Sequence, residues 1–396
     1  MKNLSSNVTE RTERRKGEEE QENTEERERL ENNRFEDQDE TTERARCEWD
    51  FHLRTVVSSA TAASDALGVI EFGPSGELLA TGGIARKIRI YRFSSLVAAA
   101  SDADGGGGDV ALLDHASAYD YYICTPAKLS SLRWRPGAGG RIIGSGDYDG
   151  VVTEYDLERR TPVFERDEHG GRRVWSVDYS HWEGCSVMAA SGSDDGTMQM
   201  WDPRCDGGEC VATVRPSATK TSSVCCVEFN PFGGPLVAVG CADRKAYGYD
   251  VRKLSDPVLI LDGHQKTVTY VRFLDDRTMV SSGTDGCLKL WNIDDARAVR
   301  TYKGHVNNRS FVGLSVWRKG GLLGCGSENN QVFVYDKRWG EPIWVRGFEP
   351  TGESGCERGF VSSVCWRQVG EEDECTLVAG GSDGALQVFV GTRKPS

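Results

Sequence analysis

The sequence predicts an all-β fold: a seven-bladed β-propeller over residues 47–396, preceded by a disordered, charged N-terminal tail over residues 1–46. The first observation behind this prediction is a repeat, in which the same order of strands, tight turn and closing aromatic residue occurs seven times. The second is the period of that repeat, which is close to the ~40–45 residues of a four-stranded blade. The third is the composition of the tail, which contains too few apolar residues to bury a core.

One repeat, residues 167–203, shows every part of the pattern. It contains a histidine, a strand over Val174–Tyr179, a second strand over Ser186–Ser191, a tight turn and a third strand that ends at Trp201-Asp202. A histidine before the first strand, an aspartate in the turn and a tryptophan that closes the third strand are typical of WD40 repeats. The chain therefore resembles a seven-bladed WD40 β-propeller.

The polar residues of the repeat predict a hydrogen-bond relay. His169 is placed to bridge Asp195 and Ser191. Ser191 is in turn placed to reach the indole N–H of Trp201, so that each buried polar group has a partner. The sixth repeat keeps a histidine but has a tyrosine for the tryptophan, and the first and fourth repeats lack the histidine. We interpret the relay residues of the third and fifth repeats as structural rather than catalytic: His169, Ser191, Asp195, Trp201, His264, Ser282, Asp285 and Trp291.

Turn glycines give the spacing of the seven repeats. Their successive differences are 64, 46, 48, 43, 43 and 55 residues. We attribute the first long spacing to a flexible surface insertion at Gly105–Gly108, and most of the last one to the loop around Glu349–Glu357. The glycines used for this count are Gly82, Gly146, Gly192, Gly240, Gly283, Gly326 and Gly381.

The segment just after the tail predicts how the ring closes. Residues 47–57 alternate like a strand, while the last repeat ends on its third strand at Val390. Residues 48–57 are therefore expected to supply the missing outer strand of the last blade. No helices are expected in the ring, and hence no helix N-terminus that would hold a phosphate.

Composition limits the partners and the compartment. The net charge of −13 argues against sequence-independent nucleic-acid binding. Residues 1–46 hold ten Lys/Arg and fifteen Asp/Glu, so −5 of that charge lies there. The cluster Arg14-Arg15-Lys16 suits either a nuclear import patch or a plain charged tail, and we expect the protein in the nucleus and cytoplasm. The absence of any long apolar run predicts no transmembrane helix and no membrane partner.

The chemistry of the sequence favours binding over catalysis. Thirteen cysteines without a signal peptide indicate buried, reduced thiols rather than disulfides. Cys205 and Cys210 are spaced like half of a zinc site, but no second half accompanies them. No HExxH, P-loop or protein-kinase signature is present. We therefore expect no enzymatic activity, no cofactor and no metal.

Two stretches carry a more specific resemblance. GHVNNRSFVGLSV with GCGSENNQVFVYDK, and GSGDYDGVVTEYD with DEHGGRRVWSVDYS, resemble the propellers of the plant constitutive-photomorphogenesis ubiquitin ligase and its suppressor-of-phytochrome-A partners. The likeness runs from about Ile70 to Val390. With only a short charged segment ahead of the ring, the chain resembles the repressor of UV-B photomorphogenesis proteins. That resemblance implies a negative regulator that binds the C-terminal tail of the UV-B photoreceptor, opposes the ligase and favours photoreceptor re-dimerisation.

The resemblance also implies a peptide site for a linear Val-Pro motif. Aromatic rings on one rim would sandwich the proline, and Lys128 and Arg173 would attract acidic residues beside it. Asn308 departs from the family, which has a glutamate there, so a preference for a basic peptide residue is in doubt. The alternative for Trp175 is ordinary packing, because it shares strand parity with core-facing residues. The implied contact residues are Lys128, Tyr148, Arg173, Trp175, Asn308 and Phe311.

A second feature follows three of the third strands. The WD-x-R type boxes that end at Arg204, Arg252 and Arg338 resemble those of substrate receptors for the cullin-4 ubiquitin ligase adaptor. An arginine that pairs with the neighbouring aspartate is the ordinary alternative. The rival function is accordingly a substrate receptor of a cullin-4 type ubiquitin ligase in light signalling, and a generic scaffold is the third.

Overall fold

The structure is a computed structural model that describes residues 45–59, 65–98, 110–181, 188–205, 210–219, 222–348 and 359–395. Two predictions lie outside these residues: the disordered tail, except for its last two residues, and the flexible insertion at Gly105–Gly108. The loop around Glu349–Glu357 also lies outside them. Neither of the short helices in the described ranges is long and apolar enough to cross a membrane.

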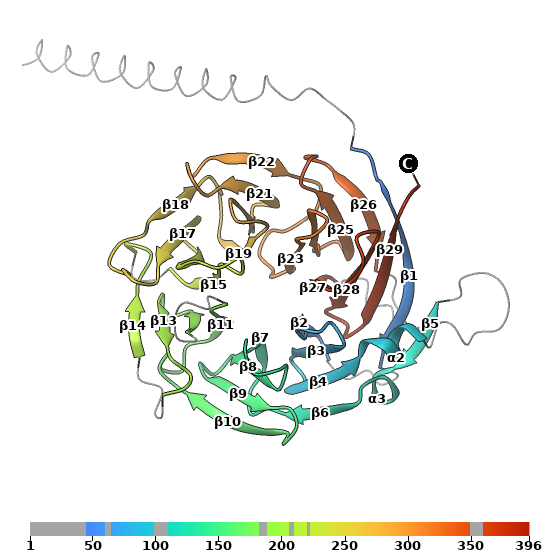
Figure 1. Ribbon diagram of the computed structural model, residues 1–396, viewed down its shortest axis with the longest axis horizontal. Helices are drawn as coiled ribbons and strands as arrows, with labels where there is room; N and C mark the ends of the chain where they lie inside the picture. The colour runs from blue at the N-terminus through green and yellow to red at the C-terminus, as the bar shows by residue number, and fades with distance from the viewer. Residues whose placement is uncertain are drawn as a thin grey trace, which may run out of the picture. The chain divides into compact units, whose positions relative to one another are not determined.

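Seven sheets surround a central channel, which confirms the seven-bladed propeller (Figure 1). Each blade has four antiparallel strands, of which the first lies innermost. The first three blades are β2 (Leu67–Phe72), β3 (Leu78–Gly83), β4 (Lys87–Arg92) and β6 (Tyr121–Cys124); β7 (Leu129–Trp134), β8 (Ile142–Asp147), β9 (Val152–Asp156) and β10 (Thr161–Arg166); and β11 (Val174–Tyr179), β12 (Ala189–Ser193), β13 (Met198–Trp201) and β14 (Cys210–Val214).

The remaining four blades repeat this arrangement. They are β15 (Val224–Phe229), β16 (Leu236–Cys241), β17 (Lys245–Asp250) and β18 (Leu259–Asp262); β19 (Val268–Phe273), β20 (Thr278–Gly283), β21 (Cys287–Asn292) and β22 (Ala298–Tyr302); β23 (Leu314–Trp317), β24 (Leu322–Cys325), β25 (Gln331–Asp336) and β26 (Pro342–Gly347); and β27 (Val361–Trp366), β28 (Glu374–Gly381) and β29 (Leu386–Arg393), followed by β1 (Trp49–Ser58) and β5 (Ala111–Asp114).

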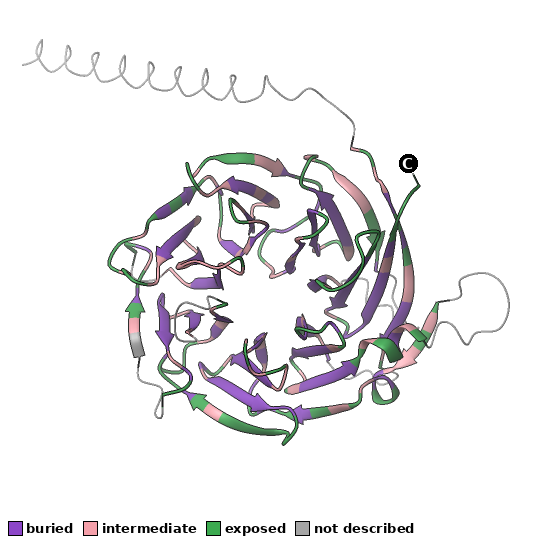
Figure 2. Ribbon diagram, viewed as in Figure 1, coloured by how far each residue is buried: buried purple, intermediate pink, exposed green. Residues whose placement is uncertain are grey.

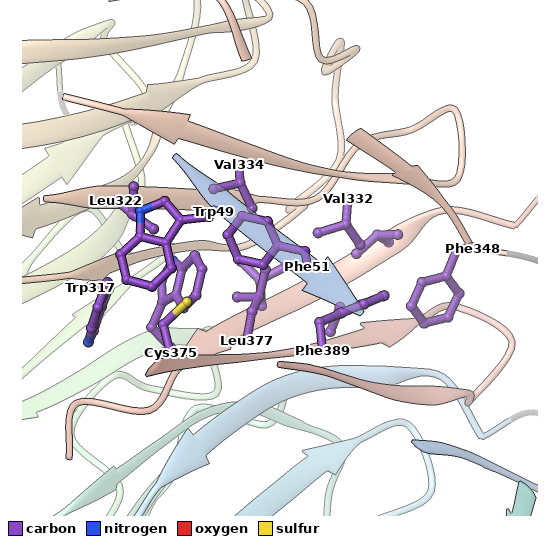
Figure 3. Close-up of a cluster of buried hydrophobic side chains, with 14 of the residues drawn as sticks. Trp49, Phe51, Trp317, Leu322, Val332, Val334, Phe348, Cys375, Leu377 and Phe389 are labelled. Carbon is purple, nitrogen blue, oxygen red and sulfur yellow. The ribbon is translucent and has the colours of Figure 1, made fainter. Parts of the chain in front are cut away.

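Strand β1 closes the ring as the sequence predicted. It pairs antiparallel with β29, from Trp49 opposite Arg393 to Val57 opposite Leu386. The side chains of Trp49 and Phe51 enter a core cluster between the sixth and seventh blades (Figure 3). The rings of Trp49 and Trp317 meet edge to face at 5.2 Å. The first strand that the structure describes thus binds the last strand of the chain through both the backbone and the core.

The expectation of a ring without helices is wrong for one segment. Helix α2 (Phe93–Ala98) and helix α3 (His115–Ala118) flank the first long insertion, and β5 adds a fifth strand parallel to β1. The Asp114 side chain caps α3 by accepting a hydrogen bond from the Ala116 N–H at 2.7 Å. The backbone carbonyl of Leu96 in α2 accepts a bond from the Thr55 hydroxyl in β1. The bond from Thr55 and the pairing of β5 hold the described ends of the insertion against the closing strand.

The core lies between neighbouring blades, and the innermost and middle strands are almost wholly buried (Figure 2). Relay residues on these strands behave as predicted in part. His169 lies 2.8 Å from Asp195 Oδ2 and 2.7 Å from Ser191 Oγ. The predicted bond from Trp201 to Ser191 is absent, and the Trp201 indole N–H has no partner among the described residues. The guanidinium of Arg166 lies over that ring instead.

In the fifth blade the relay runs through Ser281, so the prediction of Ser282 is wrong. The Ser281 hydroxyl lies 2.7 Å from His264 Nε2 and accepts a 2.7 Å bond from the Trp291 indole N–H. His264 also lies within 3.1 Å of both Asp285 oxygens. The side-chain oxygen of Ser282 is buried without a partner in the described chain. The fifth relay is therefore complete, one residue earlier than the glycine alignment indicated.

The first blade obtains a histidine from its insertion. His115 Nδ1 lies 2.8 Å from the hydroxyl of Tyr91, the residue at the tryptophan position, and His115 Nε2 lies 2.8 Å from the Gly384 carbonyl. Burial lowers the pKa of His115, which favours the neutral ring. The histidine that is missing before the first strand is thus replaced by one from elsewhere in the chain.

Candidate functional site

The predicted contact residues fall on two opposite faces of the ring. Because each blade is antiparallel, the loops that join second to third strands share a face with those that join an outermost strand to the next blade. We call this face A, and the opposite one face B. Face A holds the six residues of the predicted peptide site: Lys128, Tyr148, Arg173, Trp175, Asn308 and Phe311. Face B holds the three arginines of the WD-x-R boxes: Arg204, Arg252 and Arg338.

A continuous stack of side chains crosses the mouth of the channel on face A. The Arg173 guanidinium lies 4.1 Å from the ring centroid of Tyr148 and 4.5 Å from that of Trp175. Trp175 stacks on Phe311 with centroids 4.2 Å apart and planes 10° from parallel, and Tyr270 meets Phe311 edge-on at 5.7 Å. We call these five residues the ladder. They come from the second, third, fifth and sixth blades, so the ladder spans the channel.

A β-bulge turns Trp175 toward the channel. Val174 pairs with Ser193 and Ser176 with Gly192, which leaves Trp175 unpaired between them. The parity argument that placed this indole in the core is therefore wrong, because the bulge shifts the alternation. The indole N–H donates a 2.6 Å hydrogen bond to Asp194 Oδ1 in the next turn. This bond fixes the orientation of the ring on the rim.

The slot expected between two aromatic rings is closed in this structure. A proline between Trp175 and Phe311 would need about 7 Å between the ring planes, twice an ordinary carbon–carbon contact. The centroids lie only 4.2 Å apart. An apolar motif would therefore pack on the outer edges of the stacked pair. All five ladder side chains are only partly buried, so such edges are available.

Lys128 and Asn308 lie beside the ladder and are not part of it. The Lys128 carbonyl accepts a 2.9 Å bond from the Tyr148 N–H, which places this partly buried lysine next to the second-blade turn. The exposed Asn308 donates a 3.2 Å hydrogen bond to Glu328. Both residues thus border the predicted site, although neither contacts its rings.

Glu328 supplies a carboxylate close to the position where the family has its glutamate. Its Oε1 accepts the backbone N–H groups of Arg309 and Ser310 at 3.0 and 2.8 Å. Burial alone would raise the pKa of Glu328, but hydrogen bonds from Ser310, Arg309 and Asn308 outweigh it and lower the pKa to about 2. The charge is therefore permanent at physiological pH, and the loop amides share it.

Sequence reasoning missed three residues of this site: Asp194, Tyr270 and Glu328. The doubled aspartate Asp194-Asp195 was a visible signal, because the relay needs only one of the two carboxylates. Tyr270 and Glu328 join the site through contacts between different blades and loops, and a local sequence pattern does not predict such contacts.

Below the ladder the channel offers little room. Its cavity of about 60 Å³ is lined by inner-strand residues of all seven blades, far below the ~300 Å³ of a small-molecule pocket. Arg133 bridges Glu71 at 2.5 Å and Asp178 at 3.3 Å, and Arg318 lies 3.0 Å from Glu228. The charged groups of the channel thus pair with one another.

On face B the three box arginines fold back on their own aspartates. The Arg204 and Arg252 guanidiniums each make two bonds of 2.6–3.0 Å to the aspartate two residues earlier. The fork from Arg252 holds the pKa of Asp250 at about 2. Arg338 binds Asp336 in the same way and also reaches Glu48 at 3.1 Å. The guanidinium of Arg338 is thus also engaged by the segment that precedes β1.

Beside Arg204 lies a hollow of about 650 Å³, whose walls include Phe164, Val163 and Pro203. Cys205 is exposed at its edge, and the side chain of Cys210 lies outside the described residues. In the part of the chain that the structure describes, no group of three or more His, Cys, Asp or Glu side chains is arranged to hold a metal ion.

Comparison with known proteins gives extensive matches. The chain is 69% identical over 334 residues to WD repeat-containing protein RUP2 of Arabidopsis thaliana, covering 84% of this chain and 90% of that protein. It is 63% identical over 347 residues to RUP1 of the same plant, covering 87% and 86%. To the Arabidopsis E3 ubiquitin-protein ligase COP1 it is 35% identical over 344 residues, covering 86% of this chain but 45% of the ligase. A family model described as Nucleolar protein 10-like, N-terminal domain, matches residues 179–336.

Proposed function

Since the chain belongs to the family of the WD repeat-containing proteins RUP1 and RUP2, we propose that it is a non-enzymatic interaction module for the plant UV-B photoreceptor. Face A binds the Val-Pro containing C-terminal tail of that photoreceptor. By holding the tail, the ring represses UV-B signalling and favours the return of the photoreceptor to its dimer. The photomorphogenesis ubiquitin ligase competes for the same motif, because its propeller is related to this one.

The ladder is the observation that carries the proposal. Structural aromatic residues in this ring, such as Trp291 and Trp366, are at most 2% exposed. All five ladder members are only partly buried although they lie together at the mouth of the channel. Partly exposed aromatic groups backed by a guanidinium are typical anchors for an apolar peptide motif. A packing role alone does not require such exposure at the centre of one face.

Calorimetric titration with a Val-Pro tail peptide tests this proposal. Trp175→Ala should lower the affinity about 30- to 1000-fold, the effect of losing an aromatic hot spot worth ~2–4 kcal/mol. Phe232→Ala is the matched control, because Phe232 is an exposed aromatic residue in a face B loop. A peptide with Ala-Ala in place of Val-Pro should not bind. Equal affinities of wild type and folded Trp175→Ala would exclude face A as the site.

A second function, substrate receptor of a cullin-4 type ubiquitin ligase, draws support from face B. Three boxes present the same aspartate–arginine fork on one face, and the box at Arg204 borders the hollow. Arg204→Ala with Arg252→Ala should lower copurification of the cullin-4 adaptor and leave tail binding intact. Arg297→Ala is the control, because Arg297 pairs with Asp295 at 3.6 Å on the same face without a box. Unchanged copurification would remove this function.

A further inference from the structure

All seven turns between second and third strands contain a residue with a positive φ. A positive φ places the backbone in a region that glycine enters freely and that disfavours most other residues. Four blades place glycine there, and the sixth places asparagine, the next most tolerant choice. The first and fourth blades place arginine. The residues are Arg86 (55°), Gly150 (96°), Gly196 (79°), Arg244 (77°), Gly286 (75°), Asn330 (59°) and Gly384 (89°).

These two arginines have no ion pair that would explain their presence. Arg86 and Arg244 are exposed, and neither lies within 4 Å of a carboxylate in the described parts of the chain. The nearest acidic neighbour in sequence, Asp243, is engaged by the Tyr247 hydroxyl at 2.7 Å and the Lys245 N–H at 3.2 Å. On face B, by contrast, Arg204 and Arg252 are both held by aspartate. Strained residues without a structural gain tend to lie at functional sites.

The two arginines stand on opposite sides of the ladder. The innermost strands follow one another around the channel in chain order (Figure 1). The ladder runs from the second and third blades to the fifth and sixth. The fourth blade, which carries Arg244, therefore lies on one side of the ladder, and the first blade, which carries Arg86, lies on the other. Lys266 in the fifth blade and Lys128 in the second extend each side, and neither has a carboxylate within 4 Å in the described chain.

We propose that Arg86 and Arg244 are specificity residues for a partner segment with carboxylates on both sides of its apolar motif. One acidic stretch pairs with Arg244, the apolar pair rests on the ladder, and the second acidic stretch pairs with Arg86. Guanidinium–carboxylate pairs form forked hydrogen bonds and favour this chemistry over a neutral or basic segment. In a protein of net charge −13, cations without partners on one face also orient an acidic partner during approach. This inference rests on the proposed function of face A.

Glycine substitutions separate binding from structure. Arg86→Gly and Arg244→Gly replace a strained residue by the residue that four other turns contain, so the thermal midpoint should stay equal or rise. Each should weaken a Val-Pro peptide with acidic residues on both sides about two- to five-fold, the range of an exposed ion pair, and the loss should shrink at high salt. Asn330→Gly makes the same backbone change in the sixth blade without removing a charge, and should leave affinity unchanged.

Peptides in which amides replace the acidic residues on one side of the apolar motif show which acidic stretch pairs with Arg86 and which pairs with Arg244. Each arginine variant should lose affinity only for peptides that keep the acidic residues on its own side. If the double variant binds like wild type while Trp175→Ala fails to bind, this inference is overturned and the ladder site stands. An equal loss in Asn330→Gly would also overturn it, because the turn rather than the charge would then matter. If no peptide binds the wild type, both the proposed function and this inference are overturned.

Discussion

Trp175 and Phe311, from the third and sixth blades, stack at 4.2 Å across the channel and close the slot that a proline would have entered between them. The pair is held from one side by the bond of Trp175 to Asp194 and from the other by the edge contact of Phe311 with Tyr270. A bound motif therefore meets a preassembled platform. Its affinity depends on how well that platform is oriented, because a preorganised site loses less entropy on binding.

The first prediction concerns the orientation of the indole. Asp194→Ala removes the acceptor of the 2.6 Å bond from Trp175 and should weaken Val-Pro peptide binding several-fold, about 1 kcal/mol for one hydrogen bond. Asp194→Asn keeps an oxygen acceptor and should bind nearly as wild type. Calorimetry on both folded variants gives the comparison. A loss in Asp194→Asn as large as that in Asp194→Ala would show that the charge of Asp194, not its hydrogen bond, matters.

The second prediction separates two adjacent serines. Ser281→Ala leaves His264 Nε2 and the Trp291 indole N–H without their buried partner, which should cost about 1–3 kcal/mol of unfolding free energy. Ser282→Ala removes a buried hydroxyl that has no partner in the described chain and should be close to neutral. Urea unfolding of the two variants measures the difference. The reverse order of stabilities would restore the glycine-based assignment of the relay.

The repeat count, the ring closure and the contacts of His169 with Ser191 and Asp195 were predictable from sequence because they follow from local periodicity. The predicted bond from Trp201 to Ser191 is absent. The identity of the relay serine in the fifth blade, Ser281 instead of Ser282, was not predictable, because the turns are not aligned by their glycines. Gly283 pairs with Val268 as Ser193 pairs with Val174, so Gly192 is matched by Ser282. The relay serine is instead the residue four positions before the turn aspartate, in both the third and fifth blades.

The ladder was predictable only in part. Family resemblance implied Tyr148, Arg173, Trp175 and Phe311, and the structure brings those four together on one face. Two further features depend on a β-bulge and on contacts across the channel, namely the direction of the Trp175 ring and the participation of Tyr270. A pattern with a period of two residues carries no information about a bulge, and it therefore placed Trp175 in the core.

The third prediction is a pH dependence of stability that arises from His305. Burial lowers the pKa of His305 to about 4, whereas an unfolded histidine titrates near 6.5. Between these values the unfolded state binds a proton that the folded state does not. Stability from this group is therefore complete above pH 6.5 and falls as the pH drops toward 4, by up to ~1.4 kcal/mol per pH unit.

His305→Gln removes this proton and should flatten the pH dependence of the unfolding free energy between pH 6.5 and 4. Urea unfolding at pH 7, 6 and 5 measures the slopes. His115, whose pKa burial also lowers, is present in both proteins and cancels in the difference. Parallel curves for wild type and variant would mean that His305 is not the titrating group.

The last prediction concerns the closing strand. Deleting residues 1–44 should leave the thermal midpoint within a few degrees of wild type, because this strongly charged segment has little apolar surface to bury. Deleting residues 1–58 removes β1 as well. This deletion abolishes the strand pairing with β29 and takes the side chains of Trp49 and Phe51 out of the core between the last two blades. It also leaves β29 and β5 with unpaired edges, which invite aggregation. Loss of one buried aromatic side chain alone costs about 3–5 kcal/mol, so the shorter chain should not give soluble, cooperatively folded protein.

Thermal unfolding followed by circular dichroism, with light scattering for aggregation, compares the two truncations. Equal melting curves for both would show that the ring closes without β1, contrary to the pairing of Trp49 with Arg393.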